Sequence, residues 1–183
     1  MAVQSSQNNL GTHLIDFSLK AADEKYYSPL DFSDKDILII IFMCNHCPYV
    51  KAVMDRLVSF QKKYTDKNVQ LIAINPNDTI AYPEDSFENM KLFAEKHKMN
   101  FPYLIDETQE TARKYDAVCT PDIYVYGKDK NLRYRGRIDD SWKDESRITS
   151  RDLEKAVELL LADKEIDFQQ IPSMGCSIKW ISN

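Results

Sequence analysis

Two cysteines, Cys44 and Cys47, stand three positions apart with His46 between them. This spacing is typical of thiol–disulfide chemistry, in which a thiolate attacks a disulfide and a second thiol resolves the mixed disulfide. We predict that Cys44 is the attacking sulfur and that Cys47 resolves. His46 is predicted to favour a thiolate on Cys44, by a hydrogen bond or, when protonated, by its charge.

The segments on either side predict how the pair is positioned. Residues 37–42 form an apolar, β-branched run without alternation, which predicts a strand buried on both faces. After Pro48, apolar residues recur with helical spacing to about residue 64. Unpaired N–H groups and the helix dipole favour an anion at such a helix start, so the thiol pKa should fall below ~8.5. We expect Cys44 to be exposed and Cys47 to be more shielded.

Other uses of the same residues stay open. A Cys-x-x-Cys pair is also half of a zinc site, although no second pair and no His-x-x-x-His follows. The two cysteines could be structural, and His46 could be a solvated loop residue. Soft thiolates also suit Cu(I) or Zn, with His46, Cys119 or Cys176 as further ligands.

Composition limits the class of protein. The 183 residues fit one domain over 1–183, and a net charge of −5 argues against nucleic acid or an anionic membrane surface as partner. The chain has only four glycines, so we expect no glycine-rich phosphate loop, and no cofactor is predicted. Residues 1–10 lack the apolar core of a signal peptide, so we expect a cytoplasmic protein whose cysteines are reduced unless catalytic.

The rest of the chain alternates between strand and helix patterns. Residues 1–12 are polar and are expected to form a flexible N-terminus. Residues 164–183 read as a C-terminal tail. The strands are expected near 14–19 and 26–27, then at 37–42, 69–74, 101–105, 122–126 and 132–137, and the helices at 48–64, 86–97, 108–115 and 149–161.

A strand–helix–strand core followed by a hairpin and a closing helix resembles the thioredoxin superfamily, and specifically its peroxiredoxin-like (AhpC/TSA-like redoxin) branch with a Cys-x-x-Cys motif. The matching segments are 42–51 (FMCNHCPYVK), 73–75, 82–86 (YPEDS), 103–109, 118–122 (VCTPD), 134–140 (YRGRIDD) and 172–180 (PSMGCSIKW). The resemblance implies an α/β fold with a central mixed sheet flanked by helices, an N-terminal β-extension and a βα insertion before residue 101. It implies thiol–disulfide oxidoreductase or antioxidant activity.

The resemblance also gives roles to residues far from the motif. Thr120 and Pro121 match the loop that carries a cis-proline opposite the cysteines and leaves the Thr120 backbone free to pair with a substrate strand. Cys119 would then lie close to the pair. We hypothesise that the tail folds back over the site and brings Cys176 near Cys119 or the motif as a second redox pair. The alternative is two free, buried cysteines that act as small hydrophobes.

Two arginines follow on the last hairpin strand. Arg135 or Arg137 could face the site and stabilise a thiolate or a peroxide, and Arg137 is retained as an electrostatic candidate. The alternative is an exposed arginine at the sheet edge that pairs with Asp139 or Asp140.

The chain departs from its relatives at informative positions. Met43 replaces the Trp of thioredoxin, and Leu38 replaces its buried Asp. The peroxiredoxin pattern Pro-x-x-x-Thr-x-x-Cys has Ile40 for Pro and Cys44 for Thr, which argues against peroxidase activity. The Cys-x-His-Cys sequence resembles that of strongly oxidising relatives. Because a stabilised thiolate favours the reduced form, we expect a reduction potential above that of thioredoxin.

Three functions are therefore compared: a thiol–disulfide oxidoreductase, a peroxiredoxin-type thiol peroxidase and a thiolate metal-binding (Cu/Zn) protein. The first is favoured. Its partners would be a disulfide-containing protein or small thiol substrate and a reductase or thiol electron donor. Nucleic acid and membranes are not expected, and the sequence indicates no oligomeric state.

Overall fold

A seven-stranded mixed sheet is the frame of the molecule. The computed structural model describes residues 2–6 and 9–182. In spatial order the strands are β3 (Tyr26–Tyr27), β2 (Leu19–Ala21), β6 (Tyr103–Ile105), β5 (Val69–Asn75), β4 (Ile37–Phe42), β8 (Asp122–Tyr126) and β9 (Leu132–Arg135). β4 pairs in parallel with β5 and antiparallel with β8, so the predicted central mixed sheet is confirmed.

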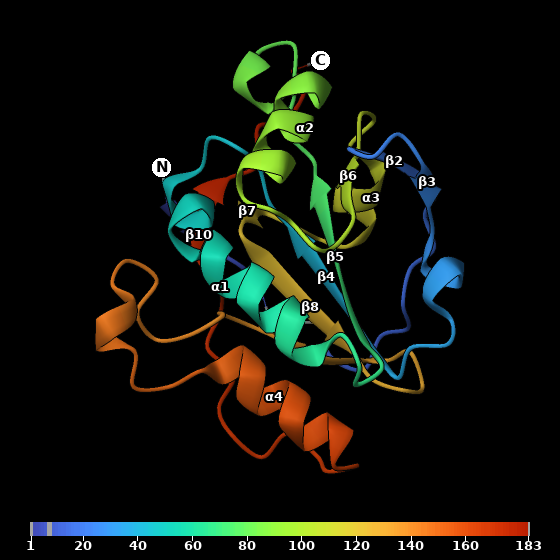
Figure 1. Ribbon diagram of the computed structural model, residues 1–183, viewed down its shortest axis with the longest axis vertical. Helices are drawn as coiled ribbons and strands as arrows, with labels where there is room; N and C mark the ends of the chain where they lie inside the picture. The colour runs from blue at the N-terminus through green and yellow to red at the C-terminus, as the bar shows by residue number, and fades with distance from the viewer. Residues whose placement is uncertain (1, 7–8, 183) are drawn as a thin grey trace.

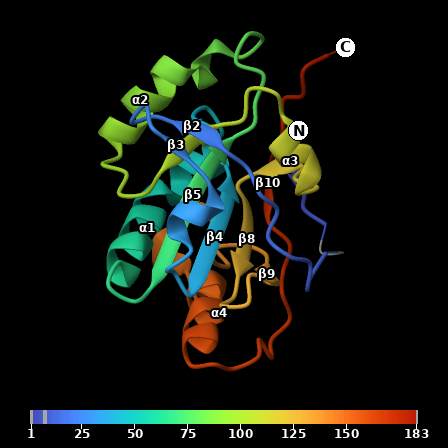
Figure 2. The same ribbon diagram turned by 90° about the vertical axis from the view of Figure 1, so that its right-hand side faces the viewer.

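β4 carries the core because all six of its residues are buried. Alternate side chains face opposite sides of the sheet. Ile39 and its neighbours on one side pack against α1 (Pro48–Tyr64) and α4 (Asp152–Leu161), whereas Leu38 and its neighbours on the other pack against aromatic residues next to α3 (Glu110–Lys114). Helices therefore cover both faces of the sheet, with α1 and α3 on opposite sides (Figures 1 and 2).

The turn between β4 and α1 lies at the C-terminal edge of the parallel strands, where open α/β sheets place their sites. Met43 N–H donates to Ile74 O at 2.9 Å, which extends the pairing of β4 with β5. Cys47 is the N-cap of α1, and Pro48 occupies its first turn. The predicted strand and helix both have the expected bounds, and they fix the position of the cysteine pair.

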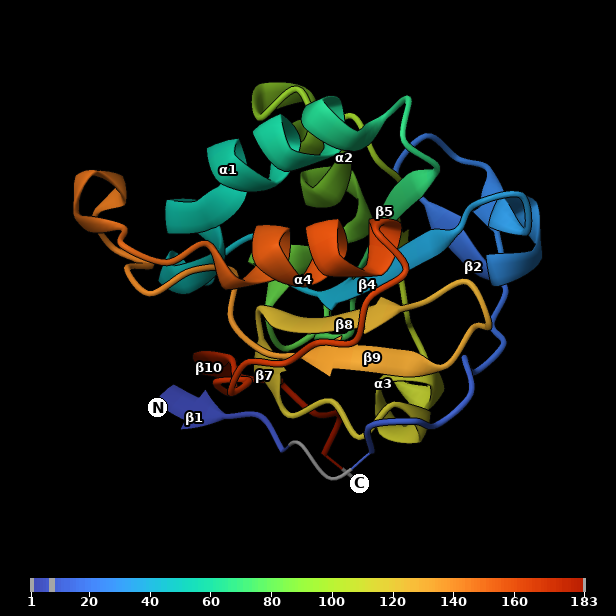
Figure 3. The same cartoon turned by 90° about the horizontal axis from the view of Figure 1, so that it is seen from below.

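A second, three-stranded sheet lies beside the first, in the order β1 (Ala2–Gln4), β10 (Met174–Ser177) and β7 (Cys119–Thr120) (Figure 3). The sequence analysis did not anticipate it, since it treated 1–12 as flexible and the tail as irregular. These strands are short and polar or glycine-containing, and their pairing comes from partners 56 to 174 residues away. The local hydropathy pattern therefore does not predict these strands.

The strand expected near 14–19 is wrong, because residues 14–18 have no regular structure and β2 only begins at Leu19. The remaining elements differ from expectation only at their ends. β6 begins at Tyr103 instead of 101, and α3 is shorter than 108–115 because Gln109 has a positive φ. α2 (Phe87–Lys96) begins after Ser86, whose side chain accepts from Asn89 N–H at 3.4 Å as an N-cap. Within the described residues, no helix combines the length and apolar character that crossing a bilayer requires.

Candidate active site

Cys44 and Cys47 lie together at the start of α1, and both are fully buried. Their side chains are in hydrogen-bond contact with each other. The prediction that Cys44 is exposed is wrong. Its sulfur lies 3.5 Å from Thr120 Oγ1, beneath the loop that the tail strand β10 covers. Sequence reasoning could not detect this cover because it is built from a nonlocal strand pairing.

The surroundings of the two sulfurs favour a negative charge on Cys47, whereas the sequence analysis expected it on Cys44. The hydrogen bond from Cys44, the Cys176 side chain and the backbone N–H groups of Val50 and Cys176 together lower the pKa of Cys47 to about 4. Donating that hydrogen bond, burial and the nearby carboxylate of Asp85 raise the pKa of Cys44. When protonated, Cys47 donates to Thr120 O at 3.1 Å. Cys47 is therefore the better nucleophile in this arrangement.

Asp85 is a site residue that the sequence analysis missed. It ends the 3-10 helix η2 (Pro83–Asp85) and is fully buried. Its Oδ1 accepts from the backbone N–H groups of Asn45 and His46, at 2.8 and 3.2 Å. Its Oδ2 accepts from His46 Nδ1 and Asn77 Nδ2, each at 2.7 Å. One carboxylate thus fixes both residues between the cysteines. The only signal was an acidic residue within 82–86, a segment that the resemblance had marked.

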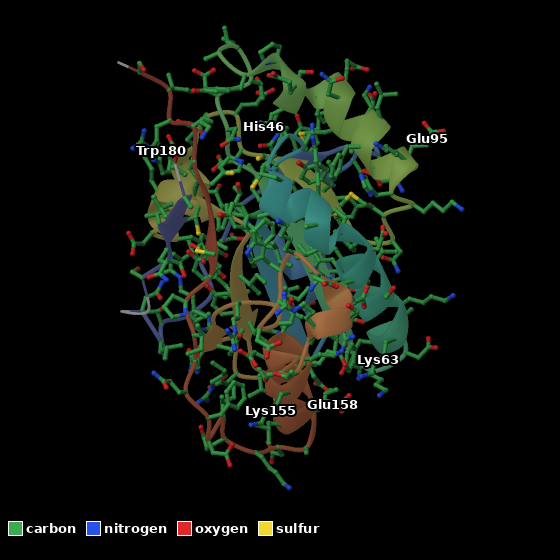
Figure 4. The ribbon with its side chains drawn as sticks, turned by 90° about the vertical axis from the view of Figure 1, so that its left-hand side faces the viewer. His46, Lys63, Glu95, Lys155, Glu158 and Trp180 are labelled. Carbon is green, nitrogen blue, oxygen red and sulfur yellow. The ribbon has the colours of Figure 1, made fainter. Side chains whose placement is uncertain are left out.

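His46 is oriented by this carboxylate and not by Cys44. Its Nδ1 donates to Asp85, and its ring stacks on Tyr82 with centroids 5.8 Å apart. The side chain is about a quarter exposed (26%), and Figure 4 shows it at the end of the molecule from which α1 begins. The reading of His46 as a freely solvated loop residue is wrong, because two partners hold it.

Thr120 and Pro121 face the cysteines as the resemblance predicts, and the peptide bond between them is cis. Thr120 contacts both sulfurs, Cys44 through its hydroxyl and Cys47 through its carbonyl. The Thr120 backbone is not free for a substrate strand in this structure, because Cys176 of β10 pairs with it.

Cys119 and Cys176 do not face each other. In the ladder of β7 and β10, Ser177 pairs with Cys119 and Cys176 pairs with Thr120. Neighbouring residues of a strand point to opposite faces, so Cys176 shares a face with Thr120 and the cysteine pair. Cys119 is buried on the other face, where burial and nearby Asp122 raise its pKa. The tail thus brings Cys176 to the Cys-x-x-Cys motif and not to Cys119.

The two arginines have structural partners other than those considered. Arg135 is fully buried, not exposed at an edge, and it forms ion pairs with Asp122 at 2.9 Å and with Asp116 at 3.7 Å. Arg137 Nε pairs with Asp152 Oδ2 at 2.6 Å. Asp139, one of the partners considered, instead forms a buried ion pair with Arg56.

A cavity of about 230 Å³ lies next to the cis-proline loop. Arg137, Tyr49, Trp142, Pro121 and Met174 are among its lining residues. The Tyr49 and Trp142 rings lie 4.2 Å apart, which gives the cavity an aromatic wall. Arg137 therefore belongs to a mostly apolar cavity beside the cis-proline loop.

Among the described residues, Cys44, His46 and Asp85 each offer a ligand atom, and the three atoms lie within 4.8 Å of one another. A thiolate, an imidazole and a carboxylate would suit Zn. His46 and Asp85 already bond to each other, however, and Asp85 also serves three other donors. A metal here would have to break the contacts that shape the loop.

The sequence matches the model of a known protein family. The model of the AhpC/TSA family matches residues 10–135, which include the cysteine pair and the cis-proline. No protein with a curated description matches the chain.

Solved structures reproduce the whole fold. An uncharacterized conserved protein from Geobacillus kaustophilus is 42% identical over 100% of this chain and 98% of its own, with a TM-score of 0.94. A hypothetical protein from Sinorhizobium meliloti is 34% identical over 98% and 99%, with a TM-score of 0.94. A putative thiol:disulfide interchange protein from Chlorobium tepidum is 16% identical over 84% and 98%, with a TM-score of 0.66. The last likeness shows that the fold is thioredoxin-like.

The charge assigned to Cys47 predicts a titration. In the reduced protein, the ultraviolet absorbance of the thiolate should rise around pH 4 and disappear in Cys47→Ser but not in the matched variant Cys119→Ser. Because the folded pKa is depressed, the contribution to stability is complete above the unfolded value near 9 and is lost as pH falls towards about 4. The free energy of unfolding of the reduced protein should therefore rise over this range relative to Cys47→Ser. A single absorbance step near pH 9 would contradict the assignment.

The Asp85 contacts predict a cost for neutralising this side chain. Asp85→Asn keeps the shape but replaces one acceptor by a donor that faces the donors of His46 and Asn77, so it should destabilise the protein by about 1–3 kcal/mol. Urea unfolding measures this cost. Glu84→Gln is the matched control, because only the backbone carbonyl of this exposed neighbour contacts the loop. Equal unfolding midpoints for the two variants would show that Asp85 does not hold the loop.

Proposed function

We propose that this chain, which belongs to the AhpC/TSA family, is a thiol–disulfide oxidoreductase whose redox couple is Cys44 and Cys47. The family and the thioredoxin-like fold support a redox function of the thioredoxin type. The observation that carries the specific proposal is the contact of the two sulfurs at the start of α1, opposite the cis-proline loop. A disulfide between them would close without rebuilding the turn.

The reaction transfers two electrons from the dithiol to a disulfide substrate. The Cys47 thiolate attacks one substrate sulfur, a Cys47–substrate bond forms, and the other substrate sulfur leaves with the electron pair and takes up a proton. Cys44 then loses its proton and attacks Cys47, which releases the second substrate thiol and leaves the Cys44–Cys47 disulfide. A thiol donor or reductase reverses these steps. The substrate is a protein disulfide or a small disulfide.

Nearby residues would assist in defined ways. Thr120 Oγ1 contacts Cys44 and is placed to donate to this sulfur when it ionises. His46 and Asp85 hold the turn between the sulfurs, and part of the imidazole is exposed to solvent. The cavity beside Pro121 offers apolar surface to the substrate chain that carries the disulfide.

Peroxide reduction is a second candidate, favoured by one observation. The sulfur with the lowered pKa, Cys47, stands where the peroxiredoxin pattern has its cysteine. Its thiolate would attack one peroxide oxygen, the O–O bond would break, and the other oxygen would leave as water or an alcohol after taking up a proton. Cys44 would then condense with the resulting Cys47 sulfenic acid, releasing water and forming the same disulfide. The replacement of the pattern's Pro and Thr by Ile40 and Cys44 argues for the first candidate.

An insulin-reduction assay with dithiothreitol as donor tests the proposal. Cys47→Ser should abolish turnover because it removes the nucleophile, and Cys44→Ser should lower it by at least ~10-fold because resolution is lost. Cys119→Ser should turn over like the unmodified protein. Hydrogen peroxide consumption and bound metal are measured on the same samples.

Each outcome separates the candidates. Insulin turnover that survives both Cys44→Ser and Cys47→Ser would refute the proposed couple. Faster consumption of peroxide than of insulin disulfides, lost in Cys47→Ser, would favour the peroxidase. Stoichiometric metal without either activity would favour a metal-binding protein.

A further inference from the structure

Cys176 is the one cysteine of the four that is partly exposed, and it touches the buried pair. We propose that Cys176 is a third redox thiol, which forms a disulfide with Cys47 and relays exchange between an external disulfide and the buried Cys44–Cys47 couple. This inference rests on the proposed function and adds the route by which a substrate reaches that couple. It concerns a residue outside the segment that the family model matches, 10–135.

The contact between Cys47 and Cys176 is direct. The side chain and the backbone N–H of Cys176 both lie close enough to Cys47 to lower the pKa of its thiol. Cys176 also packs against the core cluster that contains Cys44 and Cys47. Cys47 therefore lies between two thiols, Cys44 on its buried side and Cys176 on its solvent side. Such a central sulfur can exchange between two partners without a large movement of the chain.

Strand pairing fixes Cys176 in this position. β10 is held on both edges, with Cys176 opposite Ala2 of β1 and opposite Thr120 of β7. Ser173 O accepts from Ser5 N–H at 2.9 Å, which extends the pairing of the tail with the N-terminal segment. The beginning of α1 lies next to β10 (Figure 1). The thiol is thus part of an ordered strand and not of a loose tail.

Gly175 shows how closely the tail approaches the cis-proline loop. A Cβ atom at this position would lie 2.0 Å from Thr120 O and 2.5 Å from Thr120 C. These are backbone atoms that cannot turn aside, so only glycine permits this approach. The residue before Cys176 is therefore the one that lets the strand come close enough for the Cys47–Cys176 contact.

The burial of Cys44 and Cys47 is the reason why an accessible third thiol is needed. Cys44 and Cys47 have no exposed surface, so an external disulfide can reach either sulfur directly only when β10 moves aside. Burial and the contact with Cys47 raise the pKa of Cys176 to about 11, which Lys179 opposes with its positive charge. Cys176 is a weak nucleophile at rest but is accessible, whereas Cys47 is a strong nucleophile but is covered.

The proposed relay consists of three successive thiol–disulfide exchanges. The Cys176 thiolate attacks the substrate disulfide, and one substrate thiol leaves. The Cys47 thiolate attacks Cys176, so the Cys47–Cys176 bond forms and the second substrate thiol leaves with the electron pair. Cys44 loses its proton and attacks Cys47; the Cys44–Cys47 bond forms, and Cys176 leaves and regains a proton. The substrate has gained two electrons, and the couple has lost them.

Peptide mapping of full-length Cys44→Ser, oxidised with dithiobis(nitrobenzoate) and then alkylated, tests the proposal. Trypsin separates the relevant cysteines, because Cys44 and Cys47 lie in peptide 36–51, Cys119 in 115–128 and Cys176 in 165–179. We expect peptide 36–51 joined to peptide 165–179. Cys44→Ser/Cys119→Ser is the matched control that should keep this link, and Cys44→Ser/Cys176→Ser should lose it and retain the reagent on Cys47.

A second measurement uses the intact couple. In Cys176→Ser, the oxidation of Cys44 and Cys47 by the same reagent should be slower by at least ~10-fold, while Cys119→Ser reacts at the unmodified rate. An unchanged rate in Cys176→Ser, or a link from peptide 36–51 to any cysteine other than Cys176, overturns the relay. If the unmodified protein forms the disulfide within 36–51 in those experiments, the proposed function stands without the relay. Absence of that disulfide would instead refute the proposed function itself.

Discussion

The site depends on one buried carboxylate. Asp85 accepts hydrogen bonds from the two backbone N–H groups between the cysteines and from the His46 ring. It belongs to the segment between β5 and α2, the βα insertion that the resemblance distinguishes from plain thioredoxin. The insertion therefore does more than enlarge the sheet, because it fixes the turn in which both sulfurs lie. Thioredoxin places a buried Asp on the strand before the motif, where this chain has Leu38. In this chain the buried carboxylate near the motif is instead Asp85, which lies between β5 and α2.

This constraint determines where the charge resides. The Asp85 carboxylate disfavours a thiolate on Cys44, whereas N–H and thiol donors gather around Cys47. The helix start stabilises an anion as the sequence predicts. The favoured anion is Cys47, however, three residues after the expected Cys44. The cover formed by β7 and β10 then removes both sulfurs from solvent and leaves Cys176 at the surface side. Charge and access are thus assigned to different cysteines.

Local sequence predicted most of the frame. The apolar run of β4 and the helical spacing of α1 gave their bounds directly, because each element buries its own residues. The resemblance placed the cis-proline between Thr120 and Pro121. What could not be predicted depends on contacts between distant segments: the β1–β10–β7 sheet, the burial of Cys44, the pairing of Arg135 with Asp122, and Asp85 as the residue that holds the motif. These contacts join residues that are not neighbours in the sequence, from 13 residues apart for Arg135 and Asp122 to 170 or more for β1 and β10.

The reduction potential tests the central claim, that a thiolate on Cys47 stabilises the reduced form of a Cys44–Cys47 couple. Equilibration in glutathione buffers, with the oxidised fraction read from the loss of two hydrogens in peptide 36–51, gives its midpoint. Since 30 mV corresponds to about 1.4 kcal/mol for a two-electron couple, even a modest stabilisation is measurable. The account predicts a midpoint clearly more positive than the value of about −270 mV of thioredoxin. A midpoint at or below that value would contradict it.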